Sequence, residues 1–319
     1  MFQILDFKKS HIEEAEKLAV INYNDERANV ADLPDVHTVP DLDWFAENGK
    51  GIIAVENGKM LGYLCYWGPY DNAFSCNPSI KGVWSPAHCN CAVGYNKTRI
   101  YKEMYQALAE KWVDDGALIH AITLYAHDDT AIKAFFTYGF GLRCIDAIKL
   151  IKPCEFGCPE GVSFTELFCG DTGRITGLNN MLIGHLGKSP CFLNYRYSER
   201  TPEAVISEAE EDGIRYFIAT KQDEIVAYIK VANDGEHFAC CNMPDLKNIC
   251  GAFLLPQYRG VGIFDALFFY TESVLAYEGI KRLGVDFESF NPTAYGYWLK
   301  YFKAFTYSVV RRIDERRIV

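Results

Sequence analysis

The chain has 319 residues, of which 49% are hydrophobic and 23% are charged, and this composition excludes a mainly disordered protein. Its length is about twice that of a domain of roughly 150 residues, so two domains are predicted. The formal net charge is −10, with 32 Lys and Arg against 42 Asp and Glu, which argues against a nucleic-acid partner because nucleic acid is a polyanion.

The first residues, MFQILD, lack the basic and then apolar layout of a signal peptide. No apolar run reaches the ~20 residues that cross a bilayer. We therefore expect a cytoplasmic protein with no membrane partner. In that compartment the 12 cysteines are expected to stay reduced, and their spacing suits no zinc site, so no metal is predicted.

Two helices carry terminal signals in the sequence. Ser10 and Glu13 have the spacing of a capping box before an apolar stripe. Thr201 followed by Pro202 is typical of a helix start, and Gly213 is typical of the end of that helix. Each of these helices is predicted to open one half of the chain.

The two halves resemble each other, which indicates an internal repeat. Each contains two strand-like runs around a short turn, Asn57-Gly58 in the first half and Gln222-Asp223 in the second. Further along, a shift of 163 positions places Asp128 on Asn291. The order predicted for each half is helix, antiparallel hairpin, strand, helix, strand, helix, strand.

A stretch rich in Pro and Gly, residues 152–161, separates the two halves. We predict two domains, 1–152 and 162–319. The fold class is α/β (α+β), and each domain is expected to have a mixed, mostly antiparallel twisted sheet flanked by helices.

In the second half, a strand-like run is followed by PQYRGVGIF, residues 256–264, and then by a helix pattern. Glycines between a strand and a helix let the backbone approach a ligand closely. The first N–H groups of such a helix, together with its dipole, favour an anion such as a pyrophosphate. The turn is therefore compatible with an anion site, but many strand-to-helix turns carry glycine for shape alone. It is neither a Walker loop nor a full dinucleotide fingerprint.

The run resembles motif A of the GNAT superfamily of N-acetyltransferases, written Arg/Gln-x-x-Gly-x-Gly/Ala. From Gln257 the motif is met in full; from Arg259, Gly262 fills the fourth place and Phe264 stands where Gly or Ala belongs. The Pro-x-Tyr lead-in at 256–258 favours the second register. The resemblance implies that acetyl-CoA, as acyl donor, is bound by Phe253, Leu254, Leu255, Arg259, Gly260, Val261, Gly262, Ile263 and Phe264.

The resemblance extends to the sequence that follows. Asn291 opens an Asn-x-x-Ala run, and in this superfamily that Asn helps to hold the pantetheine arm. Seven residues later the family often has a tyrosine that protonates the leaving thiolate, but Trp298 stands here. Trp298 is therefore assigned to the acetyl-CoA site. Tyr301 and Tyr297 are the candidate acids, and Glu288, near the end of the preceding strand, is the candidate base.

The first half keeps the scaffold pattern but not the glycines. Asn96, Lys97 and Arg99 align with Arg259, Gly260 and Gly262, so bulky side chains replace both glycines. We predict a degenerate GNAT-like first domain in which only the side chains of Lys97 and Arg99 are available to meet phosphates.

The function implied by the resemblance is transfer of the acetyl group of acetyl-CoA to a primary amine, by direct attack in a ternary complex. The acceptor would be a small molecule or a peptide, and a homodimer is compatible with the many aromatic residues. One alternative is a non-catalytic sensor or scaffold that binds acyl-CoA. Enzymes with two such domains that use aminoacyl-tRNA to extend cell-wall peptides are disfavoured by the charge of −10.

Overall fold

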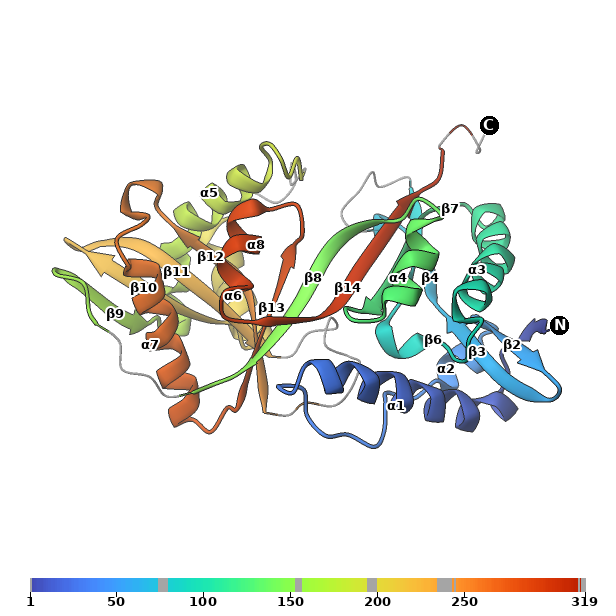
Figure 1. Ribbon diagram of the computed structural model, residues 1–319. Helices are drawn as coiled ribbons and strands as arrows, with labels where there is room; N and C mark the ends of the chain where they lie inside the picture. The colour runs from blue at the N-terminus through green and yellow to red at the C-terminus, as the bar shows by residue number, and fades with distance from the viewer. Residues whose placement is uncertain are drawn as a thin grey trace. The chain divides into compact units, whose positions relative to one another are not determined.

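In the computed structural model, the described residues are 2–73, 80–152, 157–193, 200–233, 243, 245–314 and 316. They form two compact units (Figure 1). The first unit combines Met1–Asp146 with Lys303–Val319, and the second combines Ala147–Gly235 with Met243–Phe302. The C-terminal segment thus belongs to the first unit, whereas the sequence-based boundaries assign it to the second domain. That residues 1–152 and 162–319 fold as separate domains stays a prediction.

One sheet of the first unit is built around the predicted hairpin. Asn57 and Gly58 adopt φ angles of 53° and 78°, the left-handed turn that joins neighbouring strands. The sheet has the order β1-β2-β3-β6. Its elements and the helices of this part are β1 (Gln3–Asp6), α1 (Ile12–Asn29), α2 (Asp43–Glu47), β2 (Gly51–Glu56), β3 (Lys59–Cys65) and β6 (Asn90–Ala92).

The other strands of the first unit have the order β4-β5-β7-β14-β8, and only the part of β8 up to Asp146 belongs to this unit. All nine residues of β7 are buried, as expected of a central strand. The C-terminal strand β14 pairs antiparallel with β7, and Figure 1 shows it in red beside the green β8. The bounds are β4 (Trp67–Tyr70), β5 (Lys81–Ser85), α3 (Lys97–Asp114), β7 (Ala117–Tyr125), α4 (Asp129–Phe136), β8 (Gly141–Leu150) and β14 (Lys303–Arg312).

The second unit has the strand order β13-β12-β11-β10-β9. The second predicted hairpin of the chain lies in this unit. It turns at Gln222 and Asp223, whose φ angles of 51° and 64° match the turn predicted there. The elements are β9 (Val162–Glu166), α5 (Thr176–Leu186), α6 (Pro202–Asp212), β10 (Arg215–Lys221), β11 (Glu224–Asn233), β12 (Leu246–Leu254), α7 (Ile263–Tyr277), β13 (Arg282–Glu288) and α8 (Pro292–Trp298).

Helices cover both faces of the second sheet. Successive side chains of a strand point to opposite faces. On β10, Phe217 packs against Tyr270 of α7. The neighbouring Tyr216 lies on the opposite face of the sheet, where its hydroxyl donates to Glu208 of α6. Apart from the parallel pairs β5–β7 and β12–β13, the pairings described are antiparallel. The predicted fold class, mixed and mostly antiparallel sheets flanked by helices, is confirmed.

One predicted helix boundary is confirmed and the other is wrong. The Thr201 hydroxyl accepts the Ala204 N–H, and Gly213 ends α6 with a φ of 63°. At the N-terminus, however, a 3-10 turn at 9–11 precedes α1, and His11 occupies the capping position predicted for Ser10. The Lys8 N–H is satisfied by His11 Nδ1 at 3.1 Å.

None of the described helices is both long and apolar enough to cross a bilayer. Within the described ranges, no group of three or more His, Cys, Asp or Glu side chains is placed to hold a metal ion.

Candidate functional site

A gap opens between the carboxyl ends of β12 and β13. Their parallel register runs from Leu246 beside Arg282 to Ile249 beside Val285. On the other side of β12, Cys250 is an extra residue in the pairing with β11, which is a β-bulge. A bulge bends its strand. The bend thus begins where the described pairing with β13 ends, and we call the opening beyond it the strand gap.

Backbone groups of β12 point into the strand gap. The Leu255 N–H donates to Val226 O of β11 at 2.9 Å. Because successive backbone amides of an extended strand point to opposite edges, the N–H and C=O groups of Ala252 and Leu254 point away from β11. They offer hydrogen bonds to an extended ligand that enters the gap.

The turn after β12 ends in a helix whose first N–H groups have no side-chain cap. Gly260 and Gly262 have φ angles of 79° and 82°, the left-handed conformation that favours glycine. Gly262 is the N-cap of α7 and provides no side-chain acceptor. The N–H groups of the first turn and the positive end of the helix dipole therefore face outward, as an anion site requires.

The strand gap, this turn and α8 enclose a cavity of about 400 Å³. Ten of the predicted site residues line it: Phe253, Leu254, Arg259, Gly260, Gly262, Ile263, Phe264, Asn291, Tyr297 and Trp298. Four others are outside the lining, namely Leu255, Val261, Glu288 and Tyr301. The sequence reasoning missed Leu182 and His185 of α5, and also Ala252, Asp265, Thr293, Ala294 and Lys300.

The first residue of the Asn-x-x-Ala run caps α8. Asn291 Oδ1 accepts the Ala294 N–H at 3.4 Å and the Thr293 hydroxyl at 2.7 Å. In the first unit, the aligned Asp128 accepts the Ala131 N–H at 3.0 Å as the cap of α4. The 163-position alignment therefore pairs residues with the same local role.

Two tyrosines and one carboxylate form a cluster at the α8 side of the cavity. The Tyr301 hydroxyl donates to Asp265 Oδ1 at 2.9 Å. Burial raises the pKa of the Tyr297 phenol well above its usual value, and the Asp265 carboxylate raises it further. Phe264 and Trp298 pack on the Tyr297 ring, each with a centroid distance of 4.9 Å. Tyr297 therefore keeps its proton at neutral pH and can act as a donor.

The candidate base lies at the end of β13. The Glu288 backbone C=O accepts the Asn291 N–H at 2.9 Å. Burial raises the pKa of the Cys191 thiol, and the charge of Glu288 raises it further. Two residues earlier on the same strand, Asp286 accepts the Asn248 amide at 2.7 Å.

No family model and no curated protein matches this sequence. Solved structures do match. A GCN5-related N-acetyltransferase from Sphaerobacter thermophilus is 13% identical, with a TM-score of 0.58 over 98% of this chain and 95% of that one. The acetyltransferase region of a fungal multi-domain β-N-acetylglucosaminidase is 12% identical, with a TM-score of 0.53 over 97% of this chain and 38% of that one. A tandem GNAT protein of clavulanic acid biosynthesis has a TM-score of 0.49 at 11% identity, over 97% of both chains.

This chain has the fold of a GCN5-related N-acetyltransferase. The assignment rests on the first two of these structures, and it confirms the GNAT-like fold expected from motif A. At identities of 12–13% the likeness concerns the fold.

In the first copy of the GNAT fold, β6 and β7 correspond to β12 and β13, and a side chain bridges them where the second copy has its strand gap. The buried Asn90 of β6 donates its amide to Thr123 O of β7 at 3.0 Å. At the start of α3, Lys97 is paired with Asp128 at 2.6 Å, and Arg99 with Glu103 at 2.6 Å. Both cations predicted to meet phosphates thus have an acidic partner within the first unit. That the first copy has lost acetyl-CoA binding stays a prediction.

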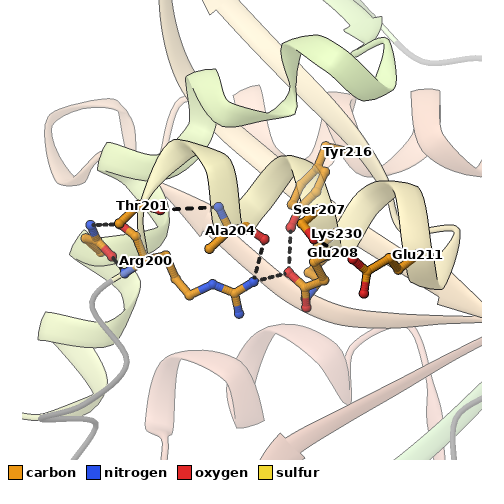
Figure 2. A network of polar contacts seen from close by, with 9 residues as sticks. Arg200, Thr201, Ala204, Ser207, Glu208, Glu211, Tyr216 and Lys230 are labelled. Carbon is orange, nitrogen blue, oxygen red and sulfur yellow. Dashed lines mark hydrogen bonds and ion pairs between the residues drawn. The ribbon is translucent and has the colours of Figure 1, made fainter.

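A polar network holds α5 and α6 of the second GNAT unit to its sheet (Figure 2). The Glu208 carboxylate of α6 accepts Lys230 Nζ of β11 and Arg200 Nη2, both at 2.6 Å. The Arg200 backbone exchanges two hydrogen bonds with the Asn180 side chain of α5, at 2.9 and 3.1 Å. Because α5 carries Leu182 and His185, the network positions one wall of the cavity.

Replacement of Glu208 by Gln is expected to lower the free energy of unfolding by about 1–3 kcal/mol, because two part-buried cations lose their anion. Urea denaturation followed by circular dichroism measures this loss. Glu211→Gln is the matched control: the residue is exposed on the same helix and accepts only Ser207 Oγ in the contacts described, at 2.6 Å. Its expected change is below about 0.5 kcal/mol. Equal losses in the two variants would contradict the role of the network.

Proposed function

We propose that the second unit binds acetyl-CoA and transfers its acetyl group to a primary amine. The observation that carries this proposal is the cavity of about 400 Å³, which joins the uncapped start of α7 to the strand gap. Its two ends suit the two ends of the ligand. A pyrophosphate needs backbone N–H donors and a helix dipole, and an extended amide-containing arm needs an unpaired strand edge.

Individual residues are proposed for each part of the reaction. The N–H groups of 260–264 would hold the pyrophosphate, and Asn291 the pantetheine arm. The Leu254 N–H, which points into the strand gap, would stabilise the negative charge that develops on the thioester oxygen. Tyr297, a buried phenol in the cavity wall, would supply the proton to the leaving sulfur. The acceptor would be the amine of a small molecule or a peptide, attacking while both substrates are bound.

Titration calorimetry with acetyl-CoA tests the binding step. Replacement of Gly262 by Glu is expected to weaken binding about 100-fold or more, because a carboxylate at the N-cap repels a phosphate and the backbone needs a φ of 82°. Gly279→Glu is the matched control: its φ is 85°, the added Cβ also meets nothing within 4 Å, and it lies outside the cavity lining. The control adds the same charge and the same strain and is expected to bind like the wild type.

The outcomes separate the candidate functions. One site per chain that is lost only in Gly262→Glu supports the second unit as the donor site, and two sites would show that the first unit also binds acetyl-CoA. Absence of binding in the wild type contradicts the proposal. Binding without turnover on a panel of primary amines would instead favour a non-catalytic acyl-CoA-binding sensor or scaffold.

A further inference from the structure

An imidazole lies in the cavity wall, on an element that motif A does not include. His185 is in the last turn of α5, one helical turn after Leu182, and both side chains line the cavity. The opposite wall is formed by the turn before α7 and by α8. Glu288, the base predicted from the sequence, is not among the lining residues.

Hydrogen bonds determine which nitrogen of His185 carries a proton. A backbone N–H can only donate, so the Asn291 side chain faces Ala294 with its oxygen, at 3.4 Å. The Thr293 hydroxyl approaches that same oxygen at 2.7 Å and must donate its proton to it. Towards His185 Nε2, at 3.5 Å, Thr293 can therefore only accept. His185 is then protonated on Nε2, and its lone pair is on Nδ1.

Several charged or titratable groups line this cavity or lie next to its walls in the chain. Arg259, Asp265, Tyr297 and Lys300 line the same cavity, Glu288 ends β13 directly before α8, and Lys188 follows α5. Of these only Asp265 and Glu288 are anionic. Asp265 accepts the Tyr301 hydroxyl, and Glu288 is not among the residues that line the cavity. His185, whose lone pair is on Nδ1, is thus the neutral base among the residues that line the cavity.

We propose that His185 is the general base of the acetyl transfer, accepting the proton of the acceptor amine on Nδ1. This inference rests on the proposed function. The ammonium form first loses one proton to solvent. As the amine nitrogen forms its bond to the acetyl carbon, it gives a second proton to Nδ1. The carbon–sulfur bond breaks, and the sulfur leaves with the electron pair and takes a proton from Tyr297. His185 then releases its proton to solvent, and the Tyr297 phenolate takes one from solvent, which restores both side chains.

The protonation state is tested without any ligand. In protein labelled with ¹⁵N-histidine, long-range ¹H–¹⁵N correlation spectra distinguish the two tautomers of each of the seven histidines. The resonance that disappears in His185→Gln is expected to show the Nε2–H form at pH 7.5. Thr293→Val, which removes the hydroxyl, is expected to mix the tautomers, and Thr293→Ser is expected to restore the wild-type spectrum. A wild-type His185 in the Nδ1–H form overturns the inference.

Kinetics test the role in transfer. With acetyl-CoA and an amine that the wild type acetylates, His185→Gln is expected to lower kcat about 100-fold. The acetyl-CoA Kd, measured by calorimetry, should change less than about threefold, and the fall of kcat/KM on the acid side of the pH profile should disappear. His37→Gln, an exposed histidine of the first unit, is the control.

These measurements separate the two hypotheses. A wild-type kcat in His185→Gln, or a 100-fold loss in Glu288→Gln alone, overturns His185 as the base but leaves acetyl transfer intact. Failure of the wild type to bind acetyl-CoA or to acetylate any amine overturns the proposed function, and the inference with it.

Discussion

Deletion of residues 303–319 is expected to unfold the first unit, although this segment begins more than 150 positions after Asp146, where the N-terminal part of that unit ends. β14 lies between β7 and β8 in the strand order. Its register with β7 runs from Thr306 beside Tyr125 to Arg312 beside Ile119. Removal of the strand would thus cut through the middle of a sheet.

The free energy lost on deletion of β14 is expected to exceed the net stability of a domain. Phe305, Thr306 and Val309 are fully buried, and each large apolar side chain contributes about 1.5–3 kcal/mol when it is buried. The deletion also leaves the buried Asp146 without the Thr306 hydroxyl that donates to it. It exposes one edge of β7, with the hydrogen-bonding groups that now pair with β14. Net stabilities of domains are about 5–15 kcal/mol, so the first unit is not expected to remain folded.

Tryptophan fluorescence provides the measurement. Four of the five tryptophans, Trp44, Trp67, Trp84 and Trp112, belong to the first unit, and Trp298 belongs to the second. The deletion is expected to shift the emission to that of solvent-exposed indole and to remove one unfolding transition. Deletion of only residues 315–319 is the control and is expected to keep the native spectrum. A native emission spectrum after removal of β14 would contradict the assignment of this strand to the first unit.

Features set by neighbouring residues could be predicted from the sequence. The turns at 57–58 and 222–223 need residues that tolerate positive φ, and they occur where such residues stand. Asp128 and Asn291 cap their helices through a side-chain oxygen that reaches three residues ahead. The prediction of a capping box at Ser10 was wrong because another nearby side chain, that of His11, accepts the Lys8 N–H just before the helix. Local patterns leave such alternatives open.

The membership of β14 could not be predicted, because strand pairing across the length of a chain leaves no local pattern. Apolar alternation predicts that 303–312 is a strand, but it is the same whether the partner is β7 or a strand of the second unit. A repeat favours the simpler expectation that each half completes its own sheet. The structure differs, and the reason lies in tertiary packing.

The same distinction applies to the site. The turn at 256–264 could be predicted because its glycines and the helix that follows are contiguous, so one segment contains the whole of the proposed anion site. His185 comes from a helix about 75 residues before that turn and carries no motif. Only the packing of α5 places it on the cavity. The Asp265–Tyr301 contact likewise depends on how α7 meets the end of α8.

Acidification is expected to destabilise the first unit through two buried histidines. Burial lowers the pKa of both His88 and His120 from 6.5 to about 4. His120 is fully buried, and its Nε2–H donates to Ala117 O at 3.1 Å. Its Nδ1 accepts the Tyr105 hydroxyl at 3.0 Å, which in turn accepts Arg311 Nη1 at 3.2 Å. A second proton on this imidazole would displace Tyr105 and place a charge near Arg311.

The direction of the effect follows from proton binding. Between pH 6.5 and about 4 the unfolded chain binds protons at these two positions and the folded chain does not, so the stabilisation is complete above pH 6.5 and is lost as the pH falls through that window. Each histidine accounts for about 3 kcal/mol over this range. Glu26 of the same unit acts in the opposite direction, because burial raises its pKa.

Urea denaturation of the wild type and of His120→Gln at a series of pH values isolates the contribution of one histidine. His120→Gln is less stable at pH 7, but its stability should fall by about 3 kcal/mol less than that of the wild type on going to pH 4. The terms from Glu26 and from the other carboxyl groups cancel in this difference. His37→Gln, at an exposed position, should follow the wild-type curve. Parallel curves for the wild type and His120→Gln would mean that His120 is charged in the folded protein. The Ala117–His120–Tyr105–Arg311 arrangement would then be wrong, since it has room for one ring proton only.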